Sequence, residues 1–291
     1  MCTFAVTLIF KTSTTTNFAE GSLAALGCYV TATCLNKYNI PVYIGVFPGI
    51  AVGVVLGLLI DVAIFRRGRN VNAVGKQIIT MGIVSIIFGA IPLIFGTPES
   101  IPFEPFYNTK KAGTSANFLI PFMGGKIVLT KHGLICVIIT VIVIGVLFLL
   151  LKHSKWGLGV RCAASNEYTA ELMGINTHVI TAMSWAIAAG LGVLGAVMYA
   201  GGGVMISTSF MVTPMVNAFL AGILGGFSTF YGPVIGAIII PIAANAVGFL
   251  ANFPGMSSIS RWNMVIVYAA MLVVILIKPS GLFGKKIVKK V

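Results

Sequence analysis

The stretch GLICVIITVIVIGVLFLLL, from Gly133 to Leu151, decides the fold class of this chain. It is apolar on every side, carries no charge, and approaches the roughly 20 residues that a helix needs to cross the hydrocarbon core of a bilayer. A strand of a membrane barrel would instead alternate apolar and polar residues over about 10 positions. The stretch therefore predicts a membrane-spanning helix.

The composition extends this prediction to the whole chain. Hydrophobic residues make up 58% and charged residues 9% of the sequence, and the mean hydropathy is +1.03, whereas a soluble domain is about 25% charged. Lipid must surround most of such a chain, and in lipid every backbone polar group needs an internal partner. We expect an all-α, polytopic transmembrane helix bundle that forms one membrane domain over residues 1–291.

Apolar runs separated by breakers predict about seven to eight membrane segments. They are Phe18 to Leu35, Val42 to Phe65, Gln77 to Phe95, Gly133 to Leu151, Val179 to Ala200, Val212 to Phe227, Pro233 to Ala251 and Met264 to Ile277. The segment from Val212 is short, begins near Pro214 and ends at a glycine pair. It is a candidate for a re-entrant or broken helix, a feature that concentrates near transport pathways.

The basic residues predict the topology. They gather at segment ends in three groups: Arg66, Arg67, Arg69 and Lys76; Lys152, Lys155 and Arg161; and Lys278, Lys285, Lys286, Lys289 and Lys290. The positive-inside rule makes these regions cytoplasmic, including the loop 152–177 and the C-terminal tail 278–291. The net charge of +13 then fits anionic membrane lipid, and no nucleic acid is expected. Residues 97–132 become a proline-bearing external loop with room for a short hairpin, although four lysines there run against the charge rule.

Signals for one short cytoplasmic helix lie within the loop 152–177. Asn166 is a good N-cap, Glu167 suits the positive end of the helix dipole, and Gly174 is a natural stop. Tyr168 and Leu172 are four residues apart and share a face, which predicts a docking role. The alternative is that this stretch is the frayed start of the next span.

Small and ionisable residues complete the picture. Gly45, Gly49, Gly53 and Gly57 lie on one helix face and predict close helix packing. Glu20 and Asp61 lie toward predicted cytoplasmic ends, where snorkelling, or pairing of Asp61 with Arg66 or Arg67, would relieve their burial. The histidines and the five cysteines are scattered. We expect no catalytic residue and no metal site.

Several segments together resemble LivH-type permeases of branched-chain amino acid ABC importers. The stretch WGLGVRCAASNEYTAELMGIN resembles the ATPase-coupling loop of that family, with Ala163, Ala164, Glu171 and Gly174 on its pattern. Residues Asn17 to Gly21 match an Asn-Phe-Ala-His-Gly motif, except that Glu20 replaces the histidine. AGILGGFSTFYGPVIGAIII and the terminal KPSGLFGKK resemble two further segments. The family has another spanning segment before the first motif, where this chain has only Met1 to Phe10, which suggests a truncated gene or a misassigned start.

The resemblance implies a multi-pass cell-membrane protein with a cytoplasmic C-terminus. It works with a second, LivM-like permease, two ATPase subunits and an extracytoplasmic substrate-binding protein. The expected ATPase-coupling residues are Ala163, Ala164, Asn166, Glu167, Tyr168, Glu171, Leu172 and Gly174. The expected substrate-pathway residues are Asn17, Phe18, Glu20, Gly21, Gly222, Gly225, Gly226, Ser228 and Thr229.

No phosphate-binding loop is present, since none of the Gly-Lys pairs is followed by Ser or Thr. We therefore expect no cofactor in this chain, with ATP and magnesium on the partner subunits. The leading interpretation is a permease subunit for branched-chain amino acids. The alternatives are a permease of the same fold for urea, amides or sugars, an ion-coupled secondary transporter, or a non-transporting remnant.

Overall fold

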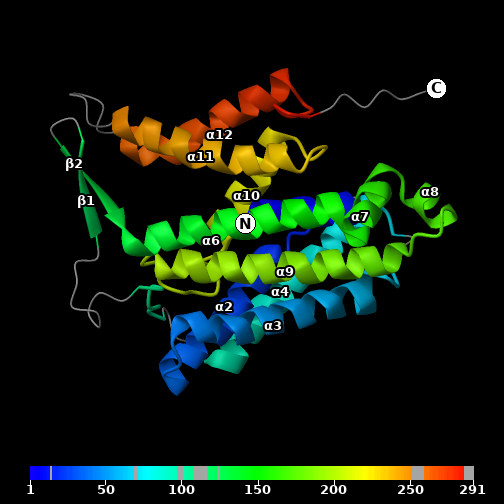
Figure 1. The fold of residues 1–291 in the computed structure, drawn as a ribbon, viewed down its shortest axis with the longest axis horizontal. Coiled ribbons are helices and arrows are strands. Elements are labelled where there is room, and N and C mark those ends of the chain that lie inside the picture. The colour runs from blue at the N-terminus through cyan, green and yellow to red at the C-terminus, as the bar shows by residue number, and fades with distance from the viewer. Residues whose placement is uncertain are drawn as a thin grey trace.

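The computed structural model describes residues 1–13, 15–68, 71–96, 101–107, 117–122, 125–250 and 259–284. These residues form helices and one β-hairpin (Figure 1). In chain order the helices are α1 (Cys2–Ser13), α2 (Glu20–Tyr38), α3 (Val42–Ile60) with its π-helical continuation η1 (Asp61–Phe65), α4 (Ala73–Phe95), α6 (Lys131–His153), α7 (Lys155–Ser165), α8 (Glu167–Leu172), α9 (Thr177–Gly201), α10 (Val212–Gly225), α11 (Tyr231–Leu250) and α12 (Ile259–Ile277). The predicted all-α polytopic bundle is confirmed.

Five helices of the described residues are long and apolar enough to cross a membrane. They are Val42–Phe65, Ala73–Phe95, Lys131–His153, Thr177–Gly201 and Tyr231–Leu250. The apolar helix α10 has 14 residues, a rise of about 21 Å, and so is shorter than the roughly 30 Å hydrocarbon core. The shortness predicted for this segment is therefore present in the structure.

Helix α2 covers most of the predicted span Phe18 to Leu35 but is less apolar than these five. Every residue from Glu20 to Tyr29 is buried by protein, so the helix needs no lipid-compatible surface. Helix α6 is the opposite case, because it is the most apolar of the candidate spans and the least buried. The most apolar candidate span is thus also the most exposed one among the described residues.

Helix α1 lies in the core of the bundle. It packs against α7, α9, α10 and α11, and its residues Thr3 to Ile9 are buried. Phe4 meets Phe148 of α6 edge to face, with 5.6 Å between ring centroids. The stretch Met1 to Phe10, which the sequence suggested was only a remnant, therefore contributes a central packing element.

The bundle has two hydrophobic cores. The larger one joins α1, α2, α3, α4, α6, α7 and α9, whereas the smaller one joins α10, α11 and α12. Figure 1 shows α11 and α12 along one side of the molecule and α3 along the other, with α6 and α9 between them. Helix α10 contacts both α1 and α2, so it connects the two groups.

The loop 152–177 contains two helices rather than the one that was predicted. Ser154 caps α7 by accepting a hydrogen bond from the Gly157 N–H at 2.9 Å. The start of α7 packs closely against the end of α6, and only a glycine fits there. A Cβ at Gly157 would lie 2.5 Å from the Leu151 Cα. Helix α8 is separated from α9 by residues 173–176, so the alternative of a frayed helix start is wrong.

The predicted external segment contains a hairpin of β1 (Asn117–Phe122) and β2 (Gly125–Thr130), paired antiparallel. Ile101 also forms a two-way backbone bridge with Ile206, with both N···O distances at 3.0 Å. The hairpin and α8 lie at opposite ends of the bundle (Figure 1). The basic residues Arg69, Lys110, Lys111, Lys285, Lys286, Lys289 and Lys290 lie outside the described residues.

Candidate functional site

The segment that leads into α2 is held by its own side chains. The Asn17 Oδ1 atom accepts a hydrogen bond from the Ala19 N–H at 2.9 Å. The Asn17 Nδ2 atom donates one to Glu20 Oε2 at 3.3 Å. Asn17 is 1% exposed and Glu20 is fully buried, so these two residues fix the start of α2 from inside the protein.

Glu20 does not snorkel as the sequence suggested. Its Oε1 atom has no hydrogen-bond partner among the described residues and faces α9, where it would crowd any Cβ added at Gly192. A helix start that is packed on all sides gives the carboxylate no route to water. The missing side chain at Gly192 is what makes room for it.

An apolar cavity of about 800 Å³ lies beside this segment. It is enclosed by the end of α1, the start of α2, α4, residues 208–211 and α10. Its lining comprises Phe10, Thr16, Phe18, Gly21, Ser22, Gln77, Met81, Val84, Phe88, Thr208, Met211, Val212, Met215, Val216, Phe219, Leu220, Ile223 and Phe227. Aromatic pairs brace it, with ring centroids 4.9 Å apart for Phe18 and Phe219 and 4.7 Å apart for Phe10 and Phe227. Such a cavity suits an apolar ligand with few polar groups.

Two of the expected substrate-pathway residues, Phe18 and Gly21, line this cavity, whereas Asn17 and Glu20 lie behind its wall. The α4 and α10 residues of the lining were missed by the sequence analysis. Their only sequence signal is that they are apolar, which every lipid-facing residue of a membrane helix also is. Gln77 is the exception, since its amide donates a hydrogen bond to Thr16 Oγ1 at 2.7 Å.

The other expected substrate-pathway residues lie at a helix break. A Cβ at Gly222 would lie 2.5 Å from Phe227 Cε1, and Gly225 meets the backbone of Gly232. Thr229 caps α11 by accepting from the Gly232 N–H at 3.2 Å. The Ser228 carbonyl accepts a hydrogen bond from Lys11 Nζ. None of Gly222, Gly225, Gly226, Ser228 and Thr229 is part of the cavity lining, although Phe227 between them is.

The C-terminal segment KPSGLFG closes over this break. The Leu282 N–H donates to the Leu224 carbonyl at 2.7 Å, and the Phe283 N–H to the Gly225 carbonyl at 3.2 Å. Gly226 and Gly281 both have positive φ, at 87° and 81°. Two motifs that are far apart in the sequence are therefore packing partners in the structure.

Helix α8 has the caps that the sequence predicted. The Thr169 N–H donates to Asn166 Oδ1 at 3.0 Å. At the other end, Gly174 adopts a φ of 81°, and the N–H groups of Gly174 and Ile175 donate to the carbonyls of Glu171 and Ala170, the pattern of a Schellman motif. Caps at both ends hold a six-residue helix that could not persist alone.

The tip of α8 is apolar and exposed. Tyr168, Leu172 and Met173 are 71%, 70% and 78% exposed, although they belong to no lipid-facing span. Glu171 instead turns back and accepts a hydrogen bond from Thr177 Oγ1 of α9. Ala163 and Ala164 lie on α7, where Ala163 is buried in the larger core, so the expected coupling residues are divided between a buried support and an exposed tip.

The glycine stripe of α3 lies against two neighbours. Near its middle, a Cβ at Gly49 would be 2.6 Å from the Gly27 carbonyl oxygen of α2. Near its end, a Cβ at Gly57 would be 2.8 Å from the Trp185 carbonyl oxygen of α9. Gly53 meets α9 with similar closeness and Gly45 meets α2 more loosely. The stripe therefore brings the backbones of α2, α3 and α9 together.

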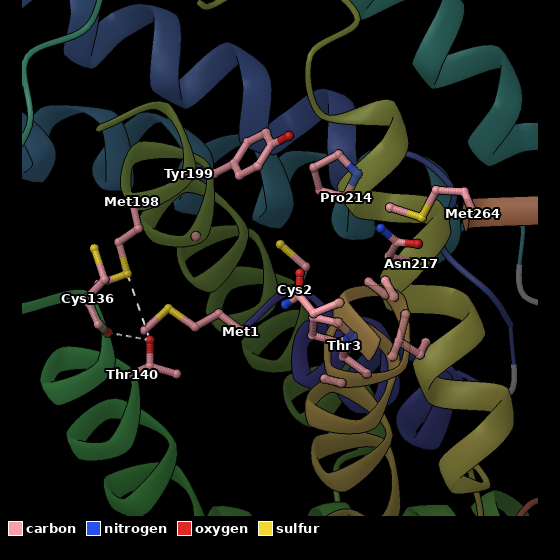
Figure 2. Close-up of a pocket in the computed structure, with 17 residues that line it drawn as sticks. Met1, Cys2, Thr3, Cys136, Thr140, Met198, Tyr199, Pro214, Asn217 and Met264 are labelled. Atoms are coloured by element: carbon pink, nitrogen blue, oxygen red, sulfur yellow. Dashed lines mark hydrogen bonds between the residues drawn. The ribbon is translucent and has the colours of Figure 1, made fainter. Parts of the chain in front are cut away.

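A second cavity, of about 560 Å³, lies at the beginning of α1, where α6, α9, α10 and α11 converge (Figure 2). Thr140 lines it and donates its hydroxyl to the Cys136 carbonyl at 2.7 Å. Asn217, on the opposite wall, accepts a hydrogen bond from the Tyr268 hydroxyl at 2.8 Å. None of the expected substrate-pathway residues lines this cavity.

Comparisons with known proteins agree with one another. The profile of the family described as "Branched-chain amino acid transport system / permease component" matches residues 1–276. The chain is 27% identical to a probable branched-chain amino acid transport permease protein LivH of Methanocaldococcus jannaschii, over 96% of this chain and 86% of that protein. It is 26% identical to the high-affinity permease protein LivH of Escherichia coli K12, over 94% and 87%, and 24% identical to the corresponding BraD of Pseudomonas aeruginosa, over 94% and 88%. No solved structure matches significantly.

Proposed function

Because the chain belongs to the family of branched-chain amino acid transport permease components, we propose that it forms half of a membrane path through which partner ATPases drive branched-chain amino acids into the cell. As a member of this family it is a multi-pass membrane protein and a transporter subunit, not an enzyme. Permeases of ABC importers work with ATPases and a substrate-binding protein. For this chain we infer two ATPases, a LivM-like second permease and an extracytoplasmic binding protein.

The exposed tip of α8 is the observation that carries this proposal. Three large side chains, Tyr168, Leu172 and Met173, are exposed on or directly after a helix that is capped at both ends. A few residues in desolvated pockets supply most of the binding energy at protein interfaces, and tyrosine is enriched among them. Tyr168 and Leu172 form the contact that enters a cleft of the ATPase, and Asn166, Glu167, Glu171 and Gly174 hold α8 in place for it.

The end of the bundle that carries α8 faces the cytoplasm in this proposal. Arg66, Lys76 and Glu167 line one small cavity at that end, and α12 runs toward that end (Figure 1). Arg66 and Lys76 thus lie on the side where the positive-inside rule expects basic residues, whereas Lys131 lies at the hairpin end. The hairpin of residues 117–130 then faces outward, and the C-terminus is cytoplasmic.

The apolar cavity is the proposed substrate pathway. Its wall of Phe, Met and Val side chains complements a branched aliphatic side chain, and Phe18 and Gly21 form its margin at α2. Asn17 and Glu20 position that margin. Gly222, Gly225, Gly226, Ser228 and Thr229 form the helix break that sets the direction of α10. Met81 and Val216 of the lining are themselves exposed, and the second permease would cover the cavity there.

The test is reconstitution of the chain with its ATPases and second permease in proteoliposomes, with leucine uptake and ATPase co-purification measured together. We expect the double variant Tyr168→Ala/Leu172→Ala to lose most ATPase binding and at least about tenfold of uptake, since truncation of a hot spot costs about 2 kcal/mol or more. The matched control is Val137→Ala/Ile138→Ala, which truncates exposed apolar residues of α6. It should leave both measurements unchanged.

The competing functions give different results in the same vesicles. Uptake driven by an ion gradient without the ATPases would contradict the proposal and favour a secondary transporter. Competition of uptake by urea, short amides or sugars, but not by valine or isoleucine, would assign a different substrate to the same fold. Full uptake by the Tyr168→Ala/Leu172→Ala variant would remove α8 from the coupling role.

A further inference from the structure

A small polar cavity of about 40 Å³ lies directly beneath α8. Five elements line it. They contribute Asp61 and Arg66 from η1 and its end, Lys76 from α4, Glu167 from α8, His178 from α9 and Ser13 from α1. No other cavity described above combines side chains of both charges in this way. It lies where the proposed docking helix joins the membrane-spanning helices.

Asp61 is the deepest charged group of this cluster. It is 3% exposed, and its Oδ2 atom has no hydrogen-bond partner among the described residues. No ion pair joins Asp61 to Arg66 or Arg67 among the described residues, but Arg66 acts electrostatically on the Asp61 carboxylate, which also has a side-chain hydrogen bond with Thr181. A buried acceptor left without a partner destabilises the folded protein by about 1–3 kcal/mol, and by more when it is charged. Such a residue calls for an explanation, either in the structure or in the function.

The cavity offers Asp61 a water-mediated connection to α8. A volume of about 40 Å³ is enough for a water molecule, which needs roughly 10–15 Å³ and two or more polar partners. Arg66 and His178 lie close enough to act electrostatically on the Asp61 carboxylate, and Glu167 reaches the same space from α8. A hydrated cluster of this composition can link elements that do not pack directly.

The backbone conformation around Asp61 directs its side chain toward the polar cavity. Asp61–Phe65 is a π-helical turn, in which the Arg66 N–H donates to the Asp61 carbonyl at 2.8 Å. Such turns insert one residue into an α-helix and concentrate at functional sites. The same turn packs Phe65 on Trp185 of α9, with ring centroids 4.8 Å apart. A shift of this turn would therefore move Trp185 and, with it, α9.

We propose that Asp61 is a positioning residue that connects α8 to the ends of α3 and α9, so that displacement of α8 by an ATPase is passed to the membrane-spanning helices. The Glu171–Thr177 hydrogen bond is a second tie between α8 and α9. Trp185 of α9 also contacts Gly57 closely, so a movement of α9 would reach the glycine stripe of α3. This inference rests on the proposed function, because it assigns Asp61 a part in the coupling of ATP hydrolysis to transport.

The test compares Asp61→Asn with Glu104→Gln in the complete reconstituted complex. Both substitutions convert an acid to its amide, but Glu104 lies near the opposite end, beside the junction of α2 with α3. For Asp61→Asn we expect normal ATPase co-purification and a fall of about tenfold in leucine transported per ATP hydrolysed, within the usual range of coupling between two sites. Asp61→Glu should restore part of the ratio, and Glu104→Gln should match the unchanged protein.

A spin label on Tyr168→Cys supplies a readout that does not depend on transport. The label should become more mobile in the Asp61→Asn background, because α8 would lose its connection to η1. If Asp61→Asn does not fold, Glu167→Gln on the α8 side of the cavity must lower the same ratio. An unchanged ratio of transport to ATP hydrolysis overturns the inference while leaving the permease function intact. Failure of the unsubstituted complex to transport would instead refute the proposed function.

Discussion

Gly226 and Gly281 join the glycine-rich break after α10 to the segment after α12. Both have positive φ, a conformation that costs an L-residue with a side chain about 1–2 kcal/mol. A Cβ at Gly281 would also lie 2.5 Å from the Gly226 nitrogen. Gly226 and Gly281 therefore leave the space in which the two segments meet.

At this scale we predict that Gly281→Ala destabilises the protein by about 1–3 kcal/mol, from the strained φ and the close backbone contact. The midpoint of thermal unfolding in detergent should fall by roughly 2–10 °C. Gly89→Ala is the control, because a Cβ at Gly89 meets no atom within 4 Å, and its midpoint should stay the same or rise. Equal midpoints for the two variants would show that the contact between the break and the C-terminal segment is dispensable.

At the scale of elements, the sequence predicted a helix correctly where a residue type is compatible with few local structures. Asn166 and Gly174 marked the ends of α8 because few residues can cap a helix, and the uninterrupted apolar run marked α6. Helix α7 and the π-turn at Asp61 were missed, since neither has a distinct composition. The cavity lining was missed because, in a membrane protein, apolar residues that face lipid, a neighbouring helix or a cavity look alike in the sequence.

The apolar cavity between α2, α4 and α10 gives the prediction for elements. Val84→Trp on α4 should fill part of the cavity and lower leucine uptake by about tenfold, equivalent to about 1.4 kcal/mol of the transport barrier. ATPase binding should persist, because α8 is far from the change. Val141→Trp on α6 is the control, with the same substitution at a position that is 66% exposed. Equal uptake by both variants would exclude the cavity from the pathway.

At the scale of the whole molecule, each end of the bundle has its own chemistry. One end carries α8 and the polar cavity of Asp61, Arg66 and Lys76, whereas the other carries the hairpin and the junction of α2 with α3 (Figure 1). Between the ends, α1 and α2 are enclosed by protein and α6 is exposed. In the proposed function, an ATPase would act at the α8 end while substrate enters from the other end.

The orientation of these ends can be measured with two matched cysteine variants. Tyr38 and Tyr168 are exposed by 62% and 71% and lie at opposite ends, so we expect opposite labelling after the five native cysteines are replaced. In intact cells a membrane-impermeant maleimide should label Tyr38→Cys but not Tyr168→Cys, which should react only after permeabilisation. The reverse pattern would invert the topology, place α8 outside and make contact between α8 and a cytoplasmic ATPase impossible.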